Sequence, residues 1–361
     1  MEKLNRDEKA LNLLRLLDEF AANEGISLEG DHEAIADKVK AALALRQQDP
    51  IAIHGLRAQA MFASVASSLG ECLQITEEDS GLFIADDKNL RRPDFLVITK
   101  DGNKFFVEVK NFSPSKKLAP FTLTKSYLAG LKSYCNRLGQ NLKIAVYWRH
   151  LGMWTLVSAD CFDEQGKNYI LSMESAFKRN EMSLLGDCMI GVVPPLAIRF
   201  YTDPDKPRQV SFDGLSDHIN ILRVAICVDG QEITDELERK LAIFFLLHGT
   251  WSKVSKPAEV VNNELIWFDI QVEPHNIESE SSQEFCVIGA LSEMISNHFQ
   301  QLTLKDGKIH RLAPQKHPGE LGILIPANYS GKILRLWRFY LQPNYDGFAG
   351  KSPTTKITFP K

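Results

Sequence analysis

The stretch Arg91-Arg92-Pro93-Asp94 … Val107-Glu108-Val109-Lys110 is the most informative part of this 361-residue chain. Two short apolar runs carry charged residues here: Asp94 starts the first run, and Glu108 and Lys110 stand two apart in the second. The intervening Asp101-Gly102-Asn103 is a strong turn signal, so an antiparallel hairpin is predicted. Charge is costly at buried strand positions unless it is paired or holds a metal, and we therefore expect chemistry here.

The predicted register decides whether these charges can meet. Side chains alternate across a strand, so Glu108 and Lys110 share one face. A three-residue loop over 101–103 sets Asp94 opposite Lys110, with all three charges on that face. A two-residue Asp-Gly turn sets Asp94 opposite Val109, on the other face. A functional site therefore requires the longer loop, which is common in hairpins, or a bulge.

Two carboxylates and a lysine at the end of a strand pair suit metal-assisted hydrolysis of a phosphodiester. Asp94 and Glu108 offer the hard oxygen ligands that Mg²⁺ prefers. The ion would polarise the phosphate and lower the pKa of a bound water. Lys110 would orient that water and stabilise charge that develops on the phosphate. The catalytic candidates are thus Asp94, Glu108 and Lys110.

Pro93-Asp94 and Glu108-Val109-Lys110 resemble the signature of the PD-(D/E)XK nuclease superfamily, which has the restriction-endonuclease-like fold. The resemblance implies that the backbone carbonyl of Val109 joins Asp94 and Glu108 in holding Mg²⁺ or Mn²⁺. It also implies a DNA endonuclease that acts in restriction, phage defence or repair. A homodimer is expected, because two active sites cut two strands most easily.

The predicted elements around the motif follow the order of that superfamily's common core, helix–strand–strand–strand–helix–strand, over about residues 50–160. The expected ranges are a helix at 51–69 ended by Gly70, a strand at 72–76, the two motif strands, a helix at 122–138 ended by Gly139, and strands at 142–148 and 153–157. The predicted fold is α/β, with a mixed sheet flanked by helices.

Members of the superfamily commonly add a carboxylate from the first helix, and this chain offers several candidates near that place. Gln59 lies near the expected position, and Glu71 follows the end of the helix. Glu77 begins an acidic run that continues with Glu78 and Asp79. We take Gln59, Glu71 and Glu77 as accessory candidates.

Positive charge is concentrated around the motif. Residues 91–150 contain twelve Lys and Arg against three acids, a net charge of +9, whereas the whole chain carries −4. A basic field is expected where a polyanion approaches a hydrolytic site. The predicted nucleic-acid-binding residues are Lys116, Lys117, Lys125 and Lys132. Lys125, Lys132 and Tyr134 resemble residues that contact scissile-strand phosphates in relatives.

Composition sets the outer bounds. With 44% hydrophobic and 24% charged residues, the chain resembles an ordinary globular protein of two or three domains. Six widely spaced cysteines form no metal-ligand pattern and are expected to be reduced. No apolar run is long enough to cross a membrane, no secretory signal is present, and no Walker-type loop occurs. These features predict a cytoplasmic protein without an ATP motor.

Three parts are predicted along the chain. Residues 1–48 form a helical segment, with helices at 5–24 and 31–47, and residues 49–205 form the nuclease-like domain. The Pro-rich stretch 203–207 marks the boundary to a C-terminal α+β domain, 208–361, whose role the sequence does not indicate. Expected in and before that domain are strands at 196–201, 221–228, 265–272, 322–326 and 333–340, helices at 234–247 and 289–302, and an acidic linker at 278–284.

The sequence therefore predicts a metal-dependent endonuclease, with two alternatives left open. One is a nuclease fold that binds nucleic acid without cutting it. The other is a protein-interaction scaffold in which Asp94, Glu108 and Lys110 form a surface ion-pair network. Binding of a divalent metal separates the enzyme from the scaffold.

Overall fold

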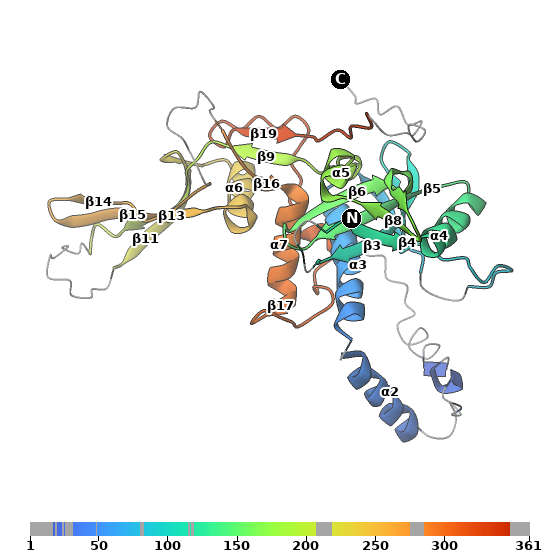
Figure 1. The fold of residues 1–361 in the computed structure, drawn as a ribbon. Helices are drawn as coiled ribbons and strands as arrows, with labels where there is room; N and C mark the ends of the chain where they lie inside the picture. Colours follow the sequence, from blue (N-terminus) through green and yellow to red (C-terminus); the bar gives the residue numbers. More distant parts are fainter. Residues whose placement is uncertain are drawn as a thin grey trace.

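The computed structural model describes residues 17–18, 20–23, 25, 32–47, 49–79, 83–114, 116, 119–206, 219–274 and 285–346. The predicted helix at 5–24 lies mostly outside these residues, and the predicted linker at 278–284 lies wholly outside them. The described chain is mixed α/β, with helices against a mixed sheet (Figure 1).

The central sheet has five strands in the order β1-β2-β3-β5-β6. Their bounds are β1 Cys72–Glu77, β2 Phe95–Thr99, β3 Lys104–Phe112, β5 Asn141–Trp148 and β6 Met153–Ser158. Strands β3 and β5 run parallel, and the other neighbouring pairs are antiparallel. The helices that flank the sheet are α3 (Pro50–Ser68) and α4 (Lys125–Arg137). The predicted order holds for these five strands and two helices, although an additional short strand lies between β3 and α4.

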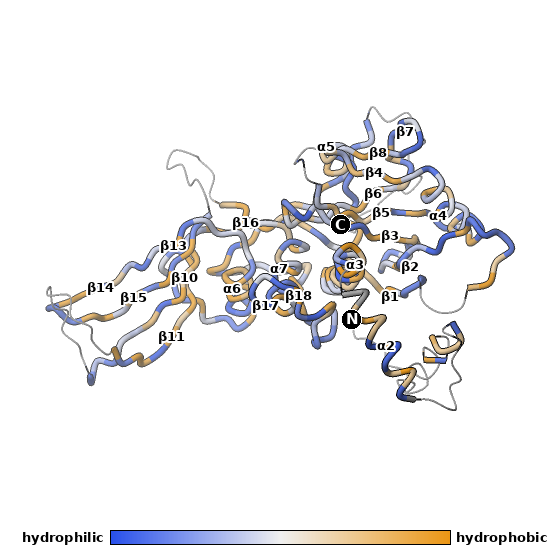
Figure 2. Tube along the Cα trace, turned by 60° about the horizontal axis from the view of Figure 1, so that its bottom comes forward, coloured by the Kyte–Doolittle hydropathy of each residue, from blue (hydrophilic) through white to orange (hydrophobic). Residues whose placement is uncertain are grey.

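Local signals define α3 at both ends. The Asp49 carboxylate accepts the backbone N–H groups of Ile51 and Ala52, each at 3.1 Å, and Pro50 takes the first helical position, where its missing N–H costs nothing. Gly70 follows the helix with φ at +95°, as the predicted end requires. In Figure 2, α3 carries hydrophobic residues where it lies between the sheet and α7 (Leu291–Thr303).

The predicted helix at 122–138 is correct only from Lys125 onward. Residues Phe121–Thr124 form a short strand, β4, which pairs with β8 (Asn168–Leu171). Phe121 and Leu123 are buried while their neighbours are exposed, which is the alternation of a strand. Thr124 then caps α4, because its hydroxyl accepts the N–H of Tyr127 at 3.3 Å.

The remaining elements extend from this sheet. They are α2 (His32–Gln47), β7 (Asp163–Gln165), α5 (Met173–Lys178), β9 (Met189–Val192), β10 (Leu196–Thr202), β11 (Ile221–Val228), β12 (Gln231–Glu232), α6 (Glu236–His248), β13 (Lys253–Ser255), β14 (Ala258–Val261), β15 (Glu264–Glu273), β16 (Cys286–Ala290), β17 (Leu304–Lys305), β18 (Lys308–Ile309) and β19 (Leu336–Phe339). The strand predicted at 322–326 is absent, since these described residues adopt no regular structure.

Strands from both sides of the predicted boundary at 203–207 share sheets. Strand β9 pairs with β16 and β19, and β10 lies between β11 and β15. One hydrophobic core also runs from α3 through α6 and α7. Strands β11, β13, β14 and β15 extend away from the central sheet, with α6 and α7 between them (Figure 1). The C-terminal segment therefore contributes to the same core as α3.

All six cysteines are free thiols, and five of them are buried. None of the helices in the described ranges combines the length and the apolar character needed to cross a membrane.

Candidate functional site

The hairpin between β2 and β3 turns one residue earlier than predicted. Its loop is 100–102 rather than 101–103, because the N–H of Thr99 donates to the carbonyl of Asn103 at 3.0 Å and closes the turn there. Gly102 has φ at +85° and donates its N–H to the carbonyl of Thr99. A residue with a β-carbon is strained in that conformation, which explains the glycine.

This register changes the partner of Asp94 but not the face it shares. Phe95 pairs with Val107, so continuing the ladder by one residue sets Asp94 opposite Glu108 instead of Lys110. The predicted partner was wrong by two positions. Because side chains alternate with a period of two, an even shift keeps Asp94 on the side of Glu108 and Lys110.

Asp94 directly precedes β2, and its side chain forms the next hydrogen bond to β3. Asp94 is 5% exposed, and its Oδ2 accepts a hydrogen bond from the backbone N–H of Val109 at 2.5 Å. If β2 were longer, a main-chain carbonyl would accept this hydrogen bond instead. Its Oδ1 accepts a hydrogen bond from Nε2 of Gln59 at 2.6 Å. Gln59, which the sequence placed near the expected position of a helix acid, therefore contacts Asp94 from α3.

The buried Glu108 and the half-buried Lys110 and Tyr127 form a triad on the α4 side of the sheet. Glu108 is 2% exposed, and Nζ of Lys110 lies 2.5 Å from its Oε1. The hydroxyl of Tyr127 donates to the same Oε1 at 2.5 Å and accepts a hydrogen bond from Nζ at 3.0 Å. The Nζ also lies 4.8 Å from the centre of the Tyr127 ring. Tyr127 thus fixes Lys110 on Glu108.

Sequence analysis missed Tyr127, although a signal was present. Tyr127 and Tyr134 are seven residues apart, so they lie on the same face of α4. Tyr134 donates to Oε2 of Glu78 at 3.0 Å, and Tyr127 reaches Glu108. This tyrosine face of α4 is the one turned toward the acids.

The surroundings of Asp94 and Lys110 shift the pKa of both groups. Burial and the neighbouring Glu108 raise the pKa of Asp94 well above its usual range, although the Val109 N–H and Lys110 oppose this. Burial alone would lower the pKa of Lys110, but Glu108 and Tyr127 outweigh it and raise that pKa. Lys110 is therefore a persistent cation, and a cation bound between the acids would displace a proton from Asp94.

The acidic accessory candidates lie in different places. Glu77 pairs with Phe95 and is exposed, one position from Asp94 along the strand pair. The N–H of Glu78 donates to the carbonyl of Asp94 at 2.9 Å. Glu71 lies at the other end of β1, with Nζ of Lys100 3.9 Å from its carboxylate. The structure therefore brings Gln59 into contact with Asp94, whereas Glu77 shares the face of Phe95 rather than that of Asp94, and Glu71 lies at the far end of β1.

The predicted nucleic-acid-binding lysines do not surround the acids. Lys125 and Lys132 lie seven residues apart on α4, two positions before the tyrosines, and two positions turn a helix by about 200°. They therefore occupy the face opposite the tyrosines, where Lys125 pairs with Glu164 and Nζ of Lys132 lies 2.6 Å from Asp160. Lys116 is exposed. Lys117 lies outside the described residues.

The basic window is partly neutralised in space. Five of its twelve cations pair with acids from outside residues 91–150: Lys100–Glu71, Lys125–Glu164, Lys132–Asp160, Arg137–Asp86 and Lys143–Glu181. These five acids reduce the net charge of +9 along the sequence by five, to +4. Lys143–Glu181 is buried, whereas the exposed pairs are weak and a phosphate can displace them.

The site supplies oxygen ligands, but fewer acids than a fully acidic metal site. Over the described part of the chain, no three His, Cys, Asp or Glu side chains gather as a metal-binding group. Asp94 and Glu108 provide two carboxylates, and Gln59 stands where a third acid would. Carboxylate, amide and main-chain oxygens with added waters are a donor set that fits Mg²⁺.

No protein-family model matches this chain, and no curated protein matches it. Among solved structures, part of the chain is similar to Hjc, a Holliday junction resolvase from the archaeal hyperthermophile Archaeoglobus fulgidus. The sequence identity is 16% and the TM-score is 0.23, and the match covers 28% of this chain and 76% of that chain.

Proposed function

We propose that this protein is a Mg²⁺- or Mn²⁺-dependent endonuclease of the PD-(D/E)XK type that hydrolyses DNA. The observation that carries the proposal is the meeting of Asp94, Glu108 and Lys110 at one end of the sheet. Two neighbouring buried carboxylates, one of which has a raised pKa, are typical of a site that holds a cation. The order helix–strand–strand–strand–helix–strand, which α3, α4 and the strands of the central sheet follow when β4 of a separate sheet is set aside, supports the same assignment.

In this proposal each residue has a distinct task. Asp94, Glu108 and the carbonyl of Val109 hold the ion, and the amide of Gln59 keeps the Asp94 carboxylate in place. When bound, the metal polarises the phosphate and makes a bound water more acidic. Lys110, whose raised pKa keeps it charged, stabilises negative charge on the phosphate rather than accepting a proton.

Nicking of supercoiled plasmid tests the proposal directly. The purified protein should convert supercoiled DNA to the open-circular form in Mg²⁺ or Mn²⁺, because the two carboxylates need a cation to act on phosphate. Excess EDTA should abolish the product, and excess Mg²⁺ should restore it. Equal nicking in EDTA, or none with either metal, would contradict the proposal.

One observation favours a second candidate, a nuclease fold that binds DNA without cutting it. Both oxygens of Asp94 already accept hydrogen bonds from the protein, and the third metal-binding position carries the neutral Gln59. The plasmid assay separates the two candidates. Metal-independent retention of DNA on a filter, without nicking, is the result that the binding module predicts.

Replacing Gln59 with glutamate should tighten Mg²⁺ binding about tenfold, because a third carboxylate adds charge to the ligand set. The concentration of Mg²⁺ for half-maximal nicking should fall accordingly. Without metal, the melting temperature should fall, since the new carboxylate at position 59 then lies beside the acids Asp94 and Glu108. A Gln59→Met variant, which cannot bind the ion, serves as the matched control. If Gln59→Glu leaves the Mg²⁺ midpoint unchanged, residue 59 does not reach the metal.

A further inference from the structure

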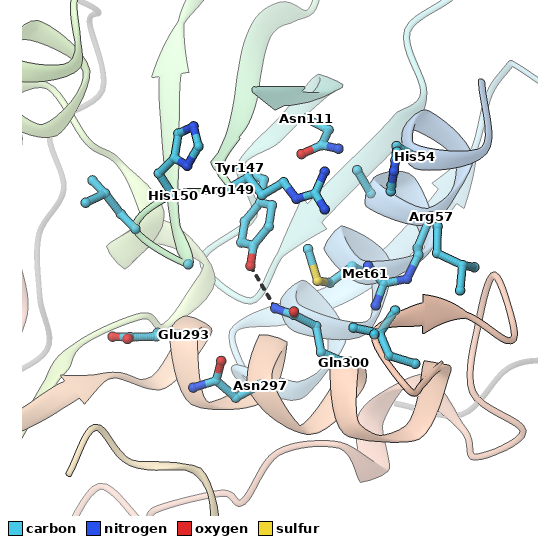
Figure 3. Close-up of a pocket in the computed structure, with 16 residues that line it drawn as sticks. His54, Arg57, Met61, Asn111, Tyr147, Arg149, His150, Glu293, Asn297 and Gln300 are labelled. Carbon is cyan, nitrogen blue, oxygen red and sulfur yellow. Dashed lines mark hydrogen bonds between the residues drawn. The ribbon is translucent and has the colours of Figure 1, made fainter. Parts of the chain in front are cut away.

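A second site lies on the opposite face of β3 from Glu108 and Lys110. It is a cavity of about 390 Å³ between α3, α7 and the ends of β3 and β5 (Figure 3). The side chains on which the argument depends are His54 and Arg57 from α3, Asn111 from β3, Arg149 after β5, and Asn297 and Gln300 from α7.

The cavity stands where open α/β sheets bind ligands. Strands β3 and β5 are parallel neighbours, and Asn111 and Arg149 lie at their carboxyl ends. Ligands commonly bind outside the carboxyl ends of parallel strands. On the other wall, Asn297 and Gln300 are on the same face of α7, three residues apart. The cavity therefore lies between the carboxyl ends of two parallel strands and the polar side chains of a helix.

The cations in this cavity lack a counter-charge. Neither Arg57 nor Arg149 forms an ion pair with any acid that the structure describes. Nη2 of Arg57 donates to Oγ1 of Thr303 at 2.8 Å, but its Nε is buried with no hydrogen-bond partner in the described chain. The buried Oδ1 of Asn111 is likewise unpartnered within these residues. Unsatisfied buried polar atoms next to unpaired cations indicate a missing ligand.

The pKa values support this interpretation. Burial and Arg149 lower the pKa of Arg57, although Tyr147 opposes the shift. Burial, Arg149 and Arg57 also lower the pKa of His54. Two arginines and a histidine are therefore held close enough to repel one another, and a bound anion would relieve that repulsion.

The acid that lines the cavity does not neutralise the arginines. Glu293 accepts a hydrogen bond from Oγ1 of Thr250 at 3.0 Å and from the N–H of Ala290 at 3.4 Å, at the start of α7. In Figure 3 it lies across the cavity from Arg57, whereas Arg57 and Arg149 extend toward the same space. Its carboxylate therefore caps the N-terminus of α7.

We propose that this cavity binds a single nucleotide, with its phosphate between Arg57 and Arg149. Its volume is at the lower end of the range for small-molecule sites, roughly 300–1,000 Å³, which suits one nucleotide. Gln300 donates its amide N–H to Tyr147 at 2.9 Å, and Asn297 donates to the carbonyl of His248 at 3.3 Å. Their amide oxygens remain to accept hydrogen bonds from a base or sugar.

The ligand chemistry is a nucleoside monophosphate, which is either free or the phosphorylated end of a DNA strand. Both bring one phosphate and one base into the cavity. This inference goes beyond the proposed nuclease and does not depend on metal at Asp94 and Glu108.

Calorimetric titration of the full chain in EDTA tests the inference. The four 5′-deoxynucleoside monophosphates, the matching deoxynucleosides and inorganic phosphate are the probes. At least one monophosphate should bind saturably, and at least tenfold more tightly than its nucleoside and than inorganic phosphate. Arg149→Gln should weaken that binding at least tenfold; Arg149 is exposed, so the variant should fold. Arg137→Gln, another exposed arginine, should bind like the wild type and is the control.

Oligonucleotides with and without a 5′-phosphate distinguish the two sources. Tighter binding of the phosphorylated oligonucleotide, in competition with the mononucleotide, assigns the site to a DNA end. Binding of the mononucleotide without this difference assigns it to a free nucleotide. The inference is overturned if neither ligand binds saturably, if inorganic phosphate or nucleosides bind as tightly as every nucleotide, or if Arg149→Gln binds like Arg137→Gln.

Discussion

Lys110→Met should lower the rate of Mg²⁺-dependent plasmid nicking by about 10²–10³-fold, the cost of removing one preorganised group that stabilises transition-state charge. Methionine keeps an apolar stem against the Tyr127 ring but removes the ammonium that lies 2.5 Å from Glu108. The measurement is the single-turnover rate at saturating Mg²⁺. Because Glu108 loses its cationic partner, the melting curve of the variant checks that it remains folded.

Two companion variants make this result interpretable. Lys100→Met removes an exposed lysine in the hairpin loop, at the far end of β2 from Asp94, and should nick at the wild-type rate. Lys110→Arg keeps the charge and should retain more activity than Lys110→Met if Lys110 acts electrostatically. Wild-type nicking by Lys110→Met would assign the activity to another site or to a contaminant.

The sequence predicted the local features of the hairpin well and its exact pairing poorly. The turn residues and the alternation of apolar side chains are local signals, so the strands and the shared face of Asp94, Glu108 and Lys110 were predictable. The partner of Asp94 depended on which residues close the turn, and Thr99 closes it one position earlier than expected. Moving the whole three-residue loop by one position moves a cross-strand partner by two.

Interactions between distant segments were not predictable. The ion pairs that partly neutralise the basic window join residues 28 to 51 positions apart, as in Lys132–Asp160 and Arg137–Asp86. The cavity combines Arg57, Arg149 and Gln300, which no spacing rule connects. The short strand β4 was predicted as part of a helix. Its pairing with β8, a segment distant in the sequence, determines its conformation.

Asp94→Asn should stabilise the metal-free protein while it abolishes metal binding. Asparagine can keep both hydrogen bonds: its Oδ1 can accept the Val109 N–H, and its amide can donate to Gln59 once that amide flips. It removes the repulsion with Glu108 that raises the pKa of Asp94. The gain should be roughly 1–2 kcal/mol in the free energy of unfolding, or about 2–6 °C in Tm.

The pH dependence of this gain has a definite sign. A carboxyl whose pKa is raised on folding contributes stability that is fully present below its unfolded pKa of about 3.9 and is lost as pH rises through the folded value. The advantage of Asp94→Asn should therefore be near zero at pH 4 and grow toward pH 8. Asp163→Asn, which changes an exposed aspartate in β7, should show no such trend and is the matched control.

Addition of Mg²⁺ should affect the stability of the wild type and of Asp94→Asn differently. Mg²⁺ should raise the Tm of the wild type, because a ligand that binds only the folded state stabilises it, and it should leave Asp94→Asn unchanged. A lower Tm for Asp94→Asn at pH 8, or equal stabilisation of both proteins by Mg²⁺, would contradict a shared site at Asp94 and Glu108. Asp94 should thus lower the stability of the protein without metal and raise it when Mg²⁺ is bound. This is expected of a metal ligand that is retained for function rather than for folding.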